Sequence, residues 1–285
     1  MLLITGATGT VGRPLVAALH AKGVRVRAVT RDPARASFPD GVEVVAGDPS
    51  RPGTLAGHFD GVEAVFVNPR AVRDAATEFA ALARERGVRR LVALAASNVE
   101  QDLAFQPSRC VGDRNRECEA AVENSGVEWV SLRPTVYANM ALPLWGGQLR
   151  AGDVVSWPYP DFADTVIDPR DVAEVAAHAL TGDGLLGRKP VLSGPGPVTN
   201  AEMVAALGRV LDRPLRYREI SATAFAEVIA RMGLPPELTA SFLARWAALE
   251  REPAEVSGEV EAVLGRRPRT FGAWAADHAS AFDAG

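Results

Sequence analysis

The sequence contains only two cysteines, Cys110 and Cys118, among its 285 residues. Both fall in a stretch with helical character, where their separation along a helix would be about 12 Å, too far for a disulfide. No apolar run approaches the roughly 18 residues of a membrane span, and no charged leader precedes the first apolar residues. These absences lead us to expect a reduced, cytoplasmic protein that does not enter a membrane.

An excess of positive charge and clustered histidines are also lacking. The formal net charge is −4, so electrostatics does not favour nucleic acid as a partner. The four histidines are scattered without the spacing of metal ligands, and we expect no metal site. A content of 47% hydrophobic and 23% charged residues is typical of a soluble globular protein. We expect a monomer or a homodimer.

A glycine-rich loop follows the first predicted strand. The apolar residues 2–5 predict a buried strand, and GATGTVG follows directly. Glycine permits backbone conformations closed to other residues and lacks the Cβ that blocks close approach. The start of the next helix supplies free amides and a positive dipole end for a pyrophosphate. A turn without a ligand is the alternative. The predicted cofactor-binding residues of this loop are Gly6, Thr8, Gly9, Thr10, Val11, Gly12 and Arg13.

Strands and helices alternate every 20–25 residues or so up to Arg133, which is typical of βαβ units around a parallel sheet. The sequence therefore predicts an α/β fold with a doubly wound parallel Rossmann sheet. Beyond Arg133 the pattern changes, and we expect a smaller, mostly helical C-terminal substrate lobe. The predicted division assigns residues 1–134 and 164–181 to the nucleotide-binding domain and residues 135–163 and 182–285 to the lobe.

Several local patterns make specific predictions. Apolar spacing predicts helices over residues 71–86 and within 108–125, and a short run predicts a strand over 164–167. Thr199, with Glu202 three residues later, has the capping-box pattern of a helix start.

The carboxyl ends of parallel strands meet at one edge of the sheet, where ligands bind. Arg31 follows the second strand and can pair with a 2′-phosphate, which favours NADP over NAD. The alternative is that Arg31 is a solvated loop residue and that Asp32 binds the ribose hydroxyls. Asp48 is predicted to meet the adenine edge, or else to serve only an Asp-Pro turn. The remaining predicted cofactor-binding residues at strand ends are Asn68, Pro69 and Ser97.

The chain resembles the NmrA-like branch of the atypical short-chain dehydrogenases/reductases. The segments that carry this resemblance are LLITGATGTVGRPLV at the start, VTRDPARA after the second strand, ENSGVEWVSLRPTVYANM at 123–140, IDPRDVAEVAAHAL at 167–180 and GRRPRTFGAWAADHASAF at 265–282. The resemblance implies an NAD(P)-binding domain with a smaller substrate lobe. The family includes quinone reductases, other NADPH reductases and members that bind the dinucleotide only to sense redox state.

The Tyr-x-x-x-Lys proton relay of the wider superfamily is missing. The resemblance places its two positions at Val111 and Asn115, and the only lysines, Lys22 and Lys189, lie far away in the sequence. An acceptor that needs little acid assistance, such as a quinone, therefore fits best, because its developing charge is delocalised. The resemblance also implies that Ser97 occupies the active-site serine position. The candidates for a hydrogen bond to the reacting oxygen are Ser97, Asn98, Asn115 and Tyr137.

Aromatic residues are few but gather between residues 137 and 162. They predict a substrate pocket for an aromatic or quinone-like small molecule, with packing in the lobe core as the alternative. The predicted substrate-binding residues are Asn98, Val99, Phe105, Tyr137, Met140, Trp145, Trp157 and Tyr159. The sequence thus predicts an NADPH-dependent reductase of a quinone-like or conjugated carbonyl. A non-catalytic NADP-binding regulator of NmrA type is the alternative.

Overall fold

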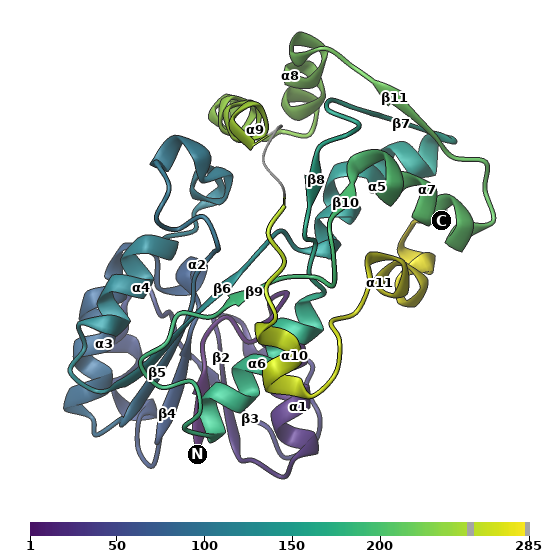
Figure 1. Cartoon of the computed structure of the whole chain (residues 1–285). Helices are drawn as coiled ribbons and strands as arrows, with labels where there is room; N and C mark the ends of the chain where they lie inside the picture. The colour runs from purple at the N-terminus through teal and green to yellow at the C-terminus, as the bar shows by residue number, and fades with distance from the viewer. Residues whose placement is uncertain (250–253, 283–285) are drawn as a thin grey trace.

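A parallel sheet between two layers of helices forms the larger part of the molecule (Figure 1). The computed structural model describes residues 1–249 and 254–282. The sheet has seven strands in the order β3-β2-β1-β4-β5-β6-β9, so the order reverses between β1 and β4, where ligands bind in such folds. The predicted doubly wound α/β Rossmann sheet is confirmed. The strands are β1 (Leu2–Ile4), β2 (Val26–Thr30), β3 (Glu43–Ala46), β4 (Ala64–Val67), β5 (Arg90–Leu94), β6 (Glu128–Pro134) and β9 (Val191–Leu192).

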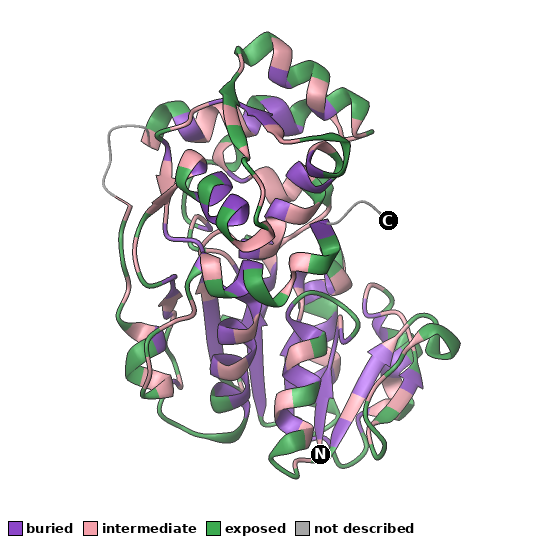
Figure 2. Cartoon of the chain, turned by 90° about the vertical axis from the view of Figure 1, so that its right-hand side faces the viewer, coloured by how far each residue is buried: buried purple, intermediate pink, exposed green. Residues whose placement is uncertain are grey.

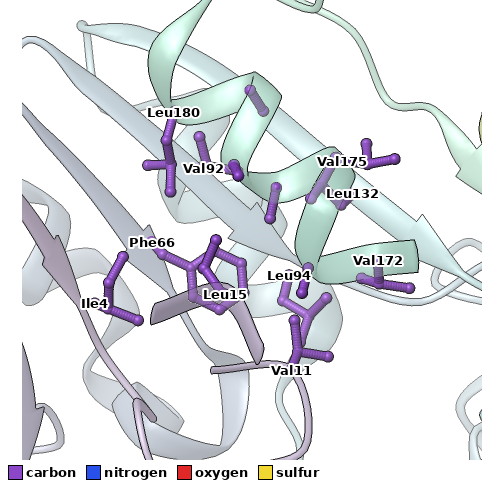
Figure 3. Close-up of a cluster of buried hydrophobic side chains, with 14 of the residues drawn as sticks. Ile4, Val11, Leu15, Phe66, Val92, Leu94, Leu132, Val172, Val175 and Leu180 are labelled. Atoms are coloured by element: carbon purple, nitrogen blue, oxygen red, sulfur yellow. The ribbon is translucent and has the colours of Figure 1, made fainter. Parts of the chain in front are cut away.

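Two hydrophobic cores hold the helices against the sheet. On one face lie α1 (Gly12–Ala21), α6 (Pro169–Thr181) and α10 (Glu259–Leu264). On the other face lie α3 (Ala76–Glu85) and α4 (Asn115–Glu123). Buried apolar side chains of this kind supply most of the favourable free energy of folding. Figure 3 shows the first core, with Ile4, Leu15, Phe66, Val92, Leu132 and Val172 among its labelled side chains.

A smaller lobe lies beyond the carboxyl ends of the strands and has a core of its own (Figure 2). Trp157, Phe225 and Trp274 are fully buried at its centre. Among the described residues, none of the helices has both the length and the apolar character needed to span a bilayer. The helices of the lobe are α5 (Ala141–Ala151), α7 (Asn200–Leu211), α8 (Ala222–Arg231), α9 (Pro236–Leu249) and α11 (Phe271–Asp277). Its strands are β7 (Val154–Trp157) with its parallel neighbour β11 (Arg216–Glu219), and β8 (Ala163–Asp164) with its antiparallel neighbour β10 (Val198–Thr199).

One predicted helix is wrong in extent because the backbone breaks within it, and a second, predicted within 108–125, is confirmed as a shorter helix. The helix predicted over 71–86 is divided into α2 (Pro69–Val72) and α3, with Arg73 at φ 50° between them. Within 108–125, only α4 is α-helical, because Gly112 adopts φ 99° after a 3₁₀ turn. Cys110 and Cys118 therefore do not share one helix, and both are free thiols.

The strand predicted over 164–167 is also wrong in extent, since β8 ends at Asp164 and only Ile167 forms an isolated bridge, to Tyr137. The predicted helix start at Thr199 is confirmed, because Thr199 and Glu202 form a complete capping box before α7.

Some segments predicted to belong to the lobe pack against the sheet. Leu185, Leu192 and Val260 are buried in the core of α1 and α6, and β9 extends the sheet itself. We therefore propose that residues 182–193 and 257–265 belong to the nucleotide-binding domain. The lobe's predicted residues 250–253 and 283–285 lie outside the described residues.

Candidate active site

The glycine loop after β1 is folded tightly on itself. Gly6 has φ +61°, in the region that favours glycine, and the Gly9 amide donates to the Gly6 carbonyl at 2.9 Å. A Cβ on Gly12 would lie 2.1 Å from the Gly6 carbonyl oxygen, so only glycine fits there. The loop therefore brings the start of α1 against the end of β1, as the spacing of the glycines predicts.

The start of α1 presents unpaired amides. Its N-cap, Val11, has no side-chain oxygen to bond them. The amides of Thr10, Val11 and Gly12 donate to no acceptor in the part of the chain that the structure describes. Since Thr8, Gly9 and Thr10 are exposed, this end of α1 is open to an anion. The residues present thus fit the pyrophosphate of a dinucleotide.

Asn68, at the end of β4, supports the loop rather than opening toward solvent. The backbone N–H of Asn68 donates 2.8 Å to the Thr5 hydroxyl, which in turn donates 2.8 Å to the Phe66 carbonyl. The Asn68 side-chain oxygen caps α2 by accepting from the amide of Arg70 at 3.0 Å, and the buried Pro69 is the first residue of that helix. A Cβ on Gly6 would lie 2.8 Å from the Asn68 side chain. Asn68 and Pro69 therefore set the floor beneath the candidate phosphate site.

The charged residues predicted for the adenosine end lie at the ends of β2 and β3. Arg31 is exposed and makes no hydrogen bond or ion pair with the residues that the structure describes. Arg13 on α1 donates 3.3 Å to the Ser37 carbonyl across the same edge. The carboxylate of Asp48 accepts 2.7 Å from the Ser50 hydroxyl, and this bond, with the positive charge of Arg31 nearby, lowers the pKa of Asp48. Asp48 thus completes its own turn while remaining charged beside Arg31.

Three polar residues predicted for catalysis or substrate binding follow β5. Ser97 is exposed, and its amide donates 2.9 Å to the Pro134 carbonyl, while its hydroxyl bonds to no described residue. Asn98 donates 2.8 Å to the Phe105 carbonyl and so shapes its own loop. Asn115 is buried at the start of α4 and donates 3.1 Å to the Ser108 hydroxyl. Of these three, Ser97 has a side chain open to a ligand.

Tyr137, just beyond β6, holds a buried hydroxyl with no hydrogen-bond partner among the described residues. Burial, together with the negative charge of Asp113, raises the pKa of Tyr137. The hydroxyl therefore stays protonated and remains available as a donor. The indole nitrogen of Trp145 is a second buried donor without a partner in the described chain. Buried donors without partners are rare in proteins and call for a ligand or ordered water.

Tyr137 and Trp145 both line one apolar cavity of about 90 Å³, between the end of β6 and the lobe. Met140 and Trp157, also predicted to bind substrate, line it too. Its lining does not include Asn98, Val99, Phe105 or Tyr159. Trp157 also belongs to the lobe core, in edge contact with Trp145 at 6.2 Å between ring centroids. Trp145 and Trp157 therefore both line the cavity and pack in the core of the lobe.

Arg245 on α9 also lines this cavity, although the sequence did not predict it as a site residue. Arg245 donates 2.7 Å to Asp164 of β8, and both side chains are only 14% exposed within the cavity lining. The guanidinium lies 5.6 Å from the centre of the Phe162 ring. One signal was available in the sequence, namely a single arginine inside the apolar run SFLARWAAL. The described residues hold no group of three or more His, Cys, Asp or Glu side chains that would bind a metal.

The chain is similar to known proteins. The NAD(P)H-binding family matches residues 6–183, which include the glycine loop and Tyr137. A Streptomyces griseus (4-alkanoyl-5-oxo-2,5-dihydrofuran-3-yl)methyl phosphate reductase is 39% identical, over 99% of both chains. A Xenophilus azovorans NAD(P)H azoreductase is 31% identical, over 100% of both chains.

The fold is also that of solved structures. An NADPH-dependent quinone oxidoreductase from Escherichia coli superimposes with a TM-score of 0.81 and 21% identity, over 97% of this chain and 99% of its own. This solved structure thus shares the fold of nearly the whole chain.

Proposed function

Because the chain belongs to the NAD(P)H-binding family, we propose that it is an NADPH-dependent reductase that transfers hydride to a conjugated carbonyl compound. One observation carries the proposal. Tyr137 and Trp145, whose buried hydroxyl and indole N–H have no partners in the described chain, both belong to the lining of one apolar cavity. An apolar lining with a few polar groups is typical of a small-molecule site, and a cavity of about 90 Å³ would hold one end of an acceptor, since whole ligand sites measure about 300–1,000 Å³.

The chemistry of such an acceptor matches what the chain offers. Hydride addition to a conjugated carbonyl spreads negative charge onto the carbonyl oxygen. A preorganised donor in a water-poor cavity stabilises that charge. Tyr137 supplies such a donor, and burial keeps it protonated by raising its pKa. A complete proton relay is then unnecessary, because solvent can deliver the proton later.

We propose that the nucleotide binds at the carboxyl ends of the strands near the start of α1, along the same edge of the sheet as the cavity. NADPH, when bound, supplies the hydride. The free amides at the start of α1 would hold the pyrophosphate, and Arg31 with Arg13 would meet the 2′-phosphate. Ser97 would lie beside the nicotinamide end, where its exposed hydroxyl can hydrogen-bond the carboxamide or the acceptor.

The relatives' names are consistent with a conjugated acceptor. The name of the Streptomyces griseus protein describes a ring double bond conjugated with carbonyl groups, and that of the Xenophilus azovorans protein describes an azo compound. Both are unsaturated systems in which added negative charge is delocalised. We propose the conjugated carbonyl for this chain because two residues of the cavity lining, Tyr137 and Trp145, carry hydrogen-bond donors without partners in the described chain.

The test is NADPH oxidation by the purified protein with a panel of acceptors: an acylated butenolide, a naphthoquinone, an azo dye and a saturated ketone. We expect turnover with the butenolide or the quinone and none with the ketone. Tight NADPH binding without turnover of any acceptor would instead support the non-catalytic regulator. Preference for the saturated ketone would contradict the delocalised acceptor.

A further inference from the structure

We propose that Arg245 recognises an anionic group, a carboxylate or a phosphate monoester, on the acceptor, and that Asp164 competes with that group for the guanidinium. This inference rests on the proposed function, because it concerns the substrate class of the same cavity. Arg245 would be a specificity-determining residue and not a catalytic one.

The surroundings of Arg245 make its charge costly. The side chain is 14% exposed and lines a cavity whose other walls include Phe242, Trp246 and Leu144. A buried charge costs several kcal/mol unless hydrogen bonds and an opposite charge compensate it. The nitrogens of Arg245 that make no hydrogen bond are not among the buried polar atoms without partners in the described chain, so the guanidinium stays open to an approaching group.

The other buried arginines of this chain are better satisfied. Arg90, at 11% exposure, donates through all three of its nitrogens, to Glu128, Asp183 and two backbone carbonyls. Arg133, also at 11%, donates to Glu119 through two nitrogens and to Glu100. We interpret these contacts as structural, because most nitrogens of each guanidinium donate to a partner within the protein.

Arg245 differs, since only its Nη2 donates to a described residue, Asp164. The other oxygen of Asp164 accepts from the Thr165 amide at 2.9 Å, so this carboxylate does not form the two-pronged pair typical of structural Arg–carboxylate contacts. Nε and Nη1 of Arg245 are left for a ligand. An anion with two oxygens would complete the guanidinium's planar fork.

Position in the cavity supports an acceptor as that ligand. Arg245 comes from α9 of the lobe and Tyr137 from the end of β6, and both line the same cavity. An acceptor with one end in this cavity would place its carbonyl near Tyr137 and a charged substituent near the guanidinium. The positive charge would then select anionic acceptors over neutral ones of equal shape.

The experiment compares three naphthoquinones that carry a carboxymethyl group, its methyl ester or a phosphate monoester. In Arg245→Gln, we expect the KM of each anionic quinone to rise about tenfold or more, and that of the ester to change less than about threefold. In Asp164→Asn, we expect the opposite for the anions, a fall in KM of about threefold or more, because the competing carboxylate is gone. The two anions show whether carboxylate or phosphate is preferred.

Several outcomes would overturn the proposal. Equal changes for the ester and the anions in both variants would mean that the pair only fastens α9 to β8. A rise in anion KM with Asp164→Asn would mean that the carboxylate helps rather than competes. If the wild-type protein reduces none of the quinones, calorimetric binding of the carboxymethyl quinone to the NADP⁺-loaded protein and its two variants still decides the question. The proposed function would then fail separately.

Discussion

The hydroxyl of Ser241 on α9 donates a 2.6 Å hydrogen bond to the backbone carbonyl of Ala104, in the segment that follows β5. This bond joins the lobe to the nucleotide-binding domain. α9 also packs against the 3₁₀ turns Leu103–Phe105 and Pro107–Val111 (Figure 1). The helix that carries Arg245 is thus held over the strand edge by contacts with the loop that follows Ser97.

Replacing Ser241 with alanine should weaken the binding of the acceptor more than the fold. Loss of one hydrogen bond between the two domains is expected to raise the acceptor KM about fivefold, equivalent to about 1 kcal/mol. Steady-state kinetics measures this, with circular dichroism to follow the fold. Ser221→Ala is the control, because Ser221 only caps α8 and its loss should lower Tm without changing KM. An unchanged KM in Ser241→Ala would show that this contact does not govern the acceptor site.

Replacing Tyr137 with phenylalanine should lower kcat while the protein stays as stable or becomes more stable. The hydroxyl has no partner among the described residues, and an unsatisfied buried group costs about 1–3 kcal/mol. We expect kcat to fall about tenfold or more and Tm to stay level or rise. Kinetics and thermal melts on the same preparation give both values.

Tyr217→Phe provides the matched control for Tyr137. The Tyr217 hydroxyl donates 2.7 Å to the Pro158 carbonyl within the lobe, and Tyr217 does not belong to the cavity lining. Its removal should lower Tm and leave kcat unchanged. Because burial raises the pKa of Tyr137, the wild-type kcat should also show no alkaline decline from this group below the ordinary range of tyrosine. A decline that disappears in Tyr137→Phe would contradict this assignment.

The sequence predicted most of the sheet and the glycine loop, because their signals are local. Buried strands read as apolar runs, and the glycines and the capping box at Thr199 stand at fixed spacings. The break at Arg73 was not predictable, since a non-glycine residue with positive φ leaves no pattern in the sequence. The prediction that Cys110 and Cys118 share one helix was wrong because Gly112, with φ 99°, ends the 3₁₀ turn between them.

Part of the candidate site follows from the topology of the sheet. Residues that follow a strand, such as Ser97 and Tyr137, lie where parallel topology brings strand ends together. Arg245 and Asp164 are 81 residues apart in the sequence, and only the packing of α9 against the lobe core brings them into contact. A pair formed by tertiary packing has no fixed spacing from which sequence could have inferred it.

Glu119 should contribute to the loss of stability in acid. Burial by itself raises the pKa of this carboxyl, but hydrogen bonds from Arg133 and Ser131 outweigh burial and bring it below the ordinary 4.5. A carboxyl with a lowered folded pKa stabilises the protein above pH 4.5, and this contribution is lost as pH falls through the folded value. Glu119→Gln should therefore melt at a lower Tm near neutral pH and show a flatter decline of Tm below about pH 4.5.

Glu100→Gln is the control for Glu119→Gln, because it removes the other carboxylate that pairs with Arg133. Glu100 also accepts from Arg133, but it is 75% exposed, and exposed pairs contribute about 0–1 kcal/mol. Its variant should melt close to the wild-type Tm at every pH. If Glu119→Gln and Glu100→Gln behaved alike, the buried geometry of Glu119 would not be the cause.

Arg31 should decide between the two nicotinamide dinucleotides, because its guanidinium is exposed beside the open end of the nucleotide site and bonds to no described residue. Arg31→Ala should weaken NADPH binding about tenfold to a hundredfold, the loss expected for hydrogen bonds to a charged phosphate, and change NADH binding less than about twofold. Arg25→Ala is the control, since Arg25 is an exposed arginine near the amino end of the same strand, β2, and its removal changes the net charge equally. Fluorescence titration at two salt concentrations measures both dinucleotides, and the NADPH preference should shrink at high salt because the charge is solvent-exposed. Equal losses for NADPH and NADH would instead favour Asp32 as the ribose-binding residue and Arg31 as a solvated loop residue.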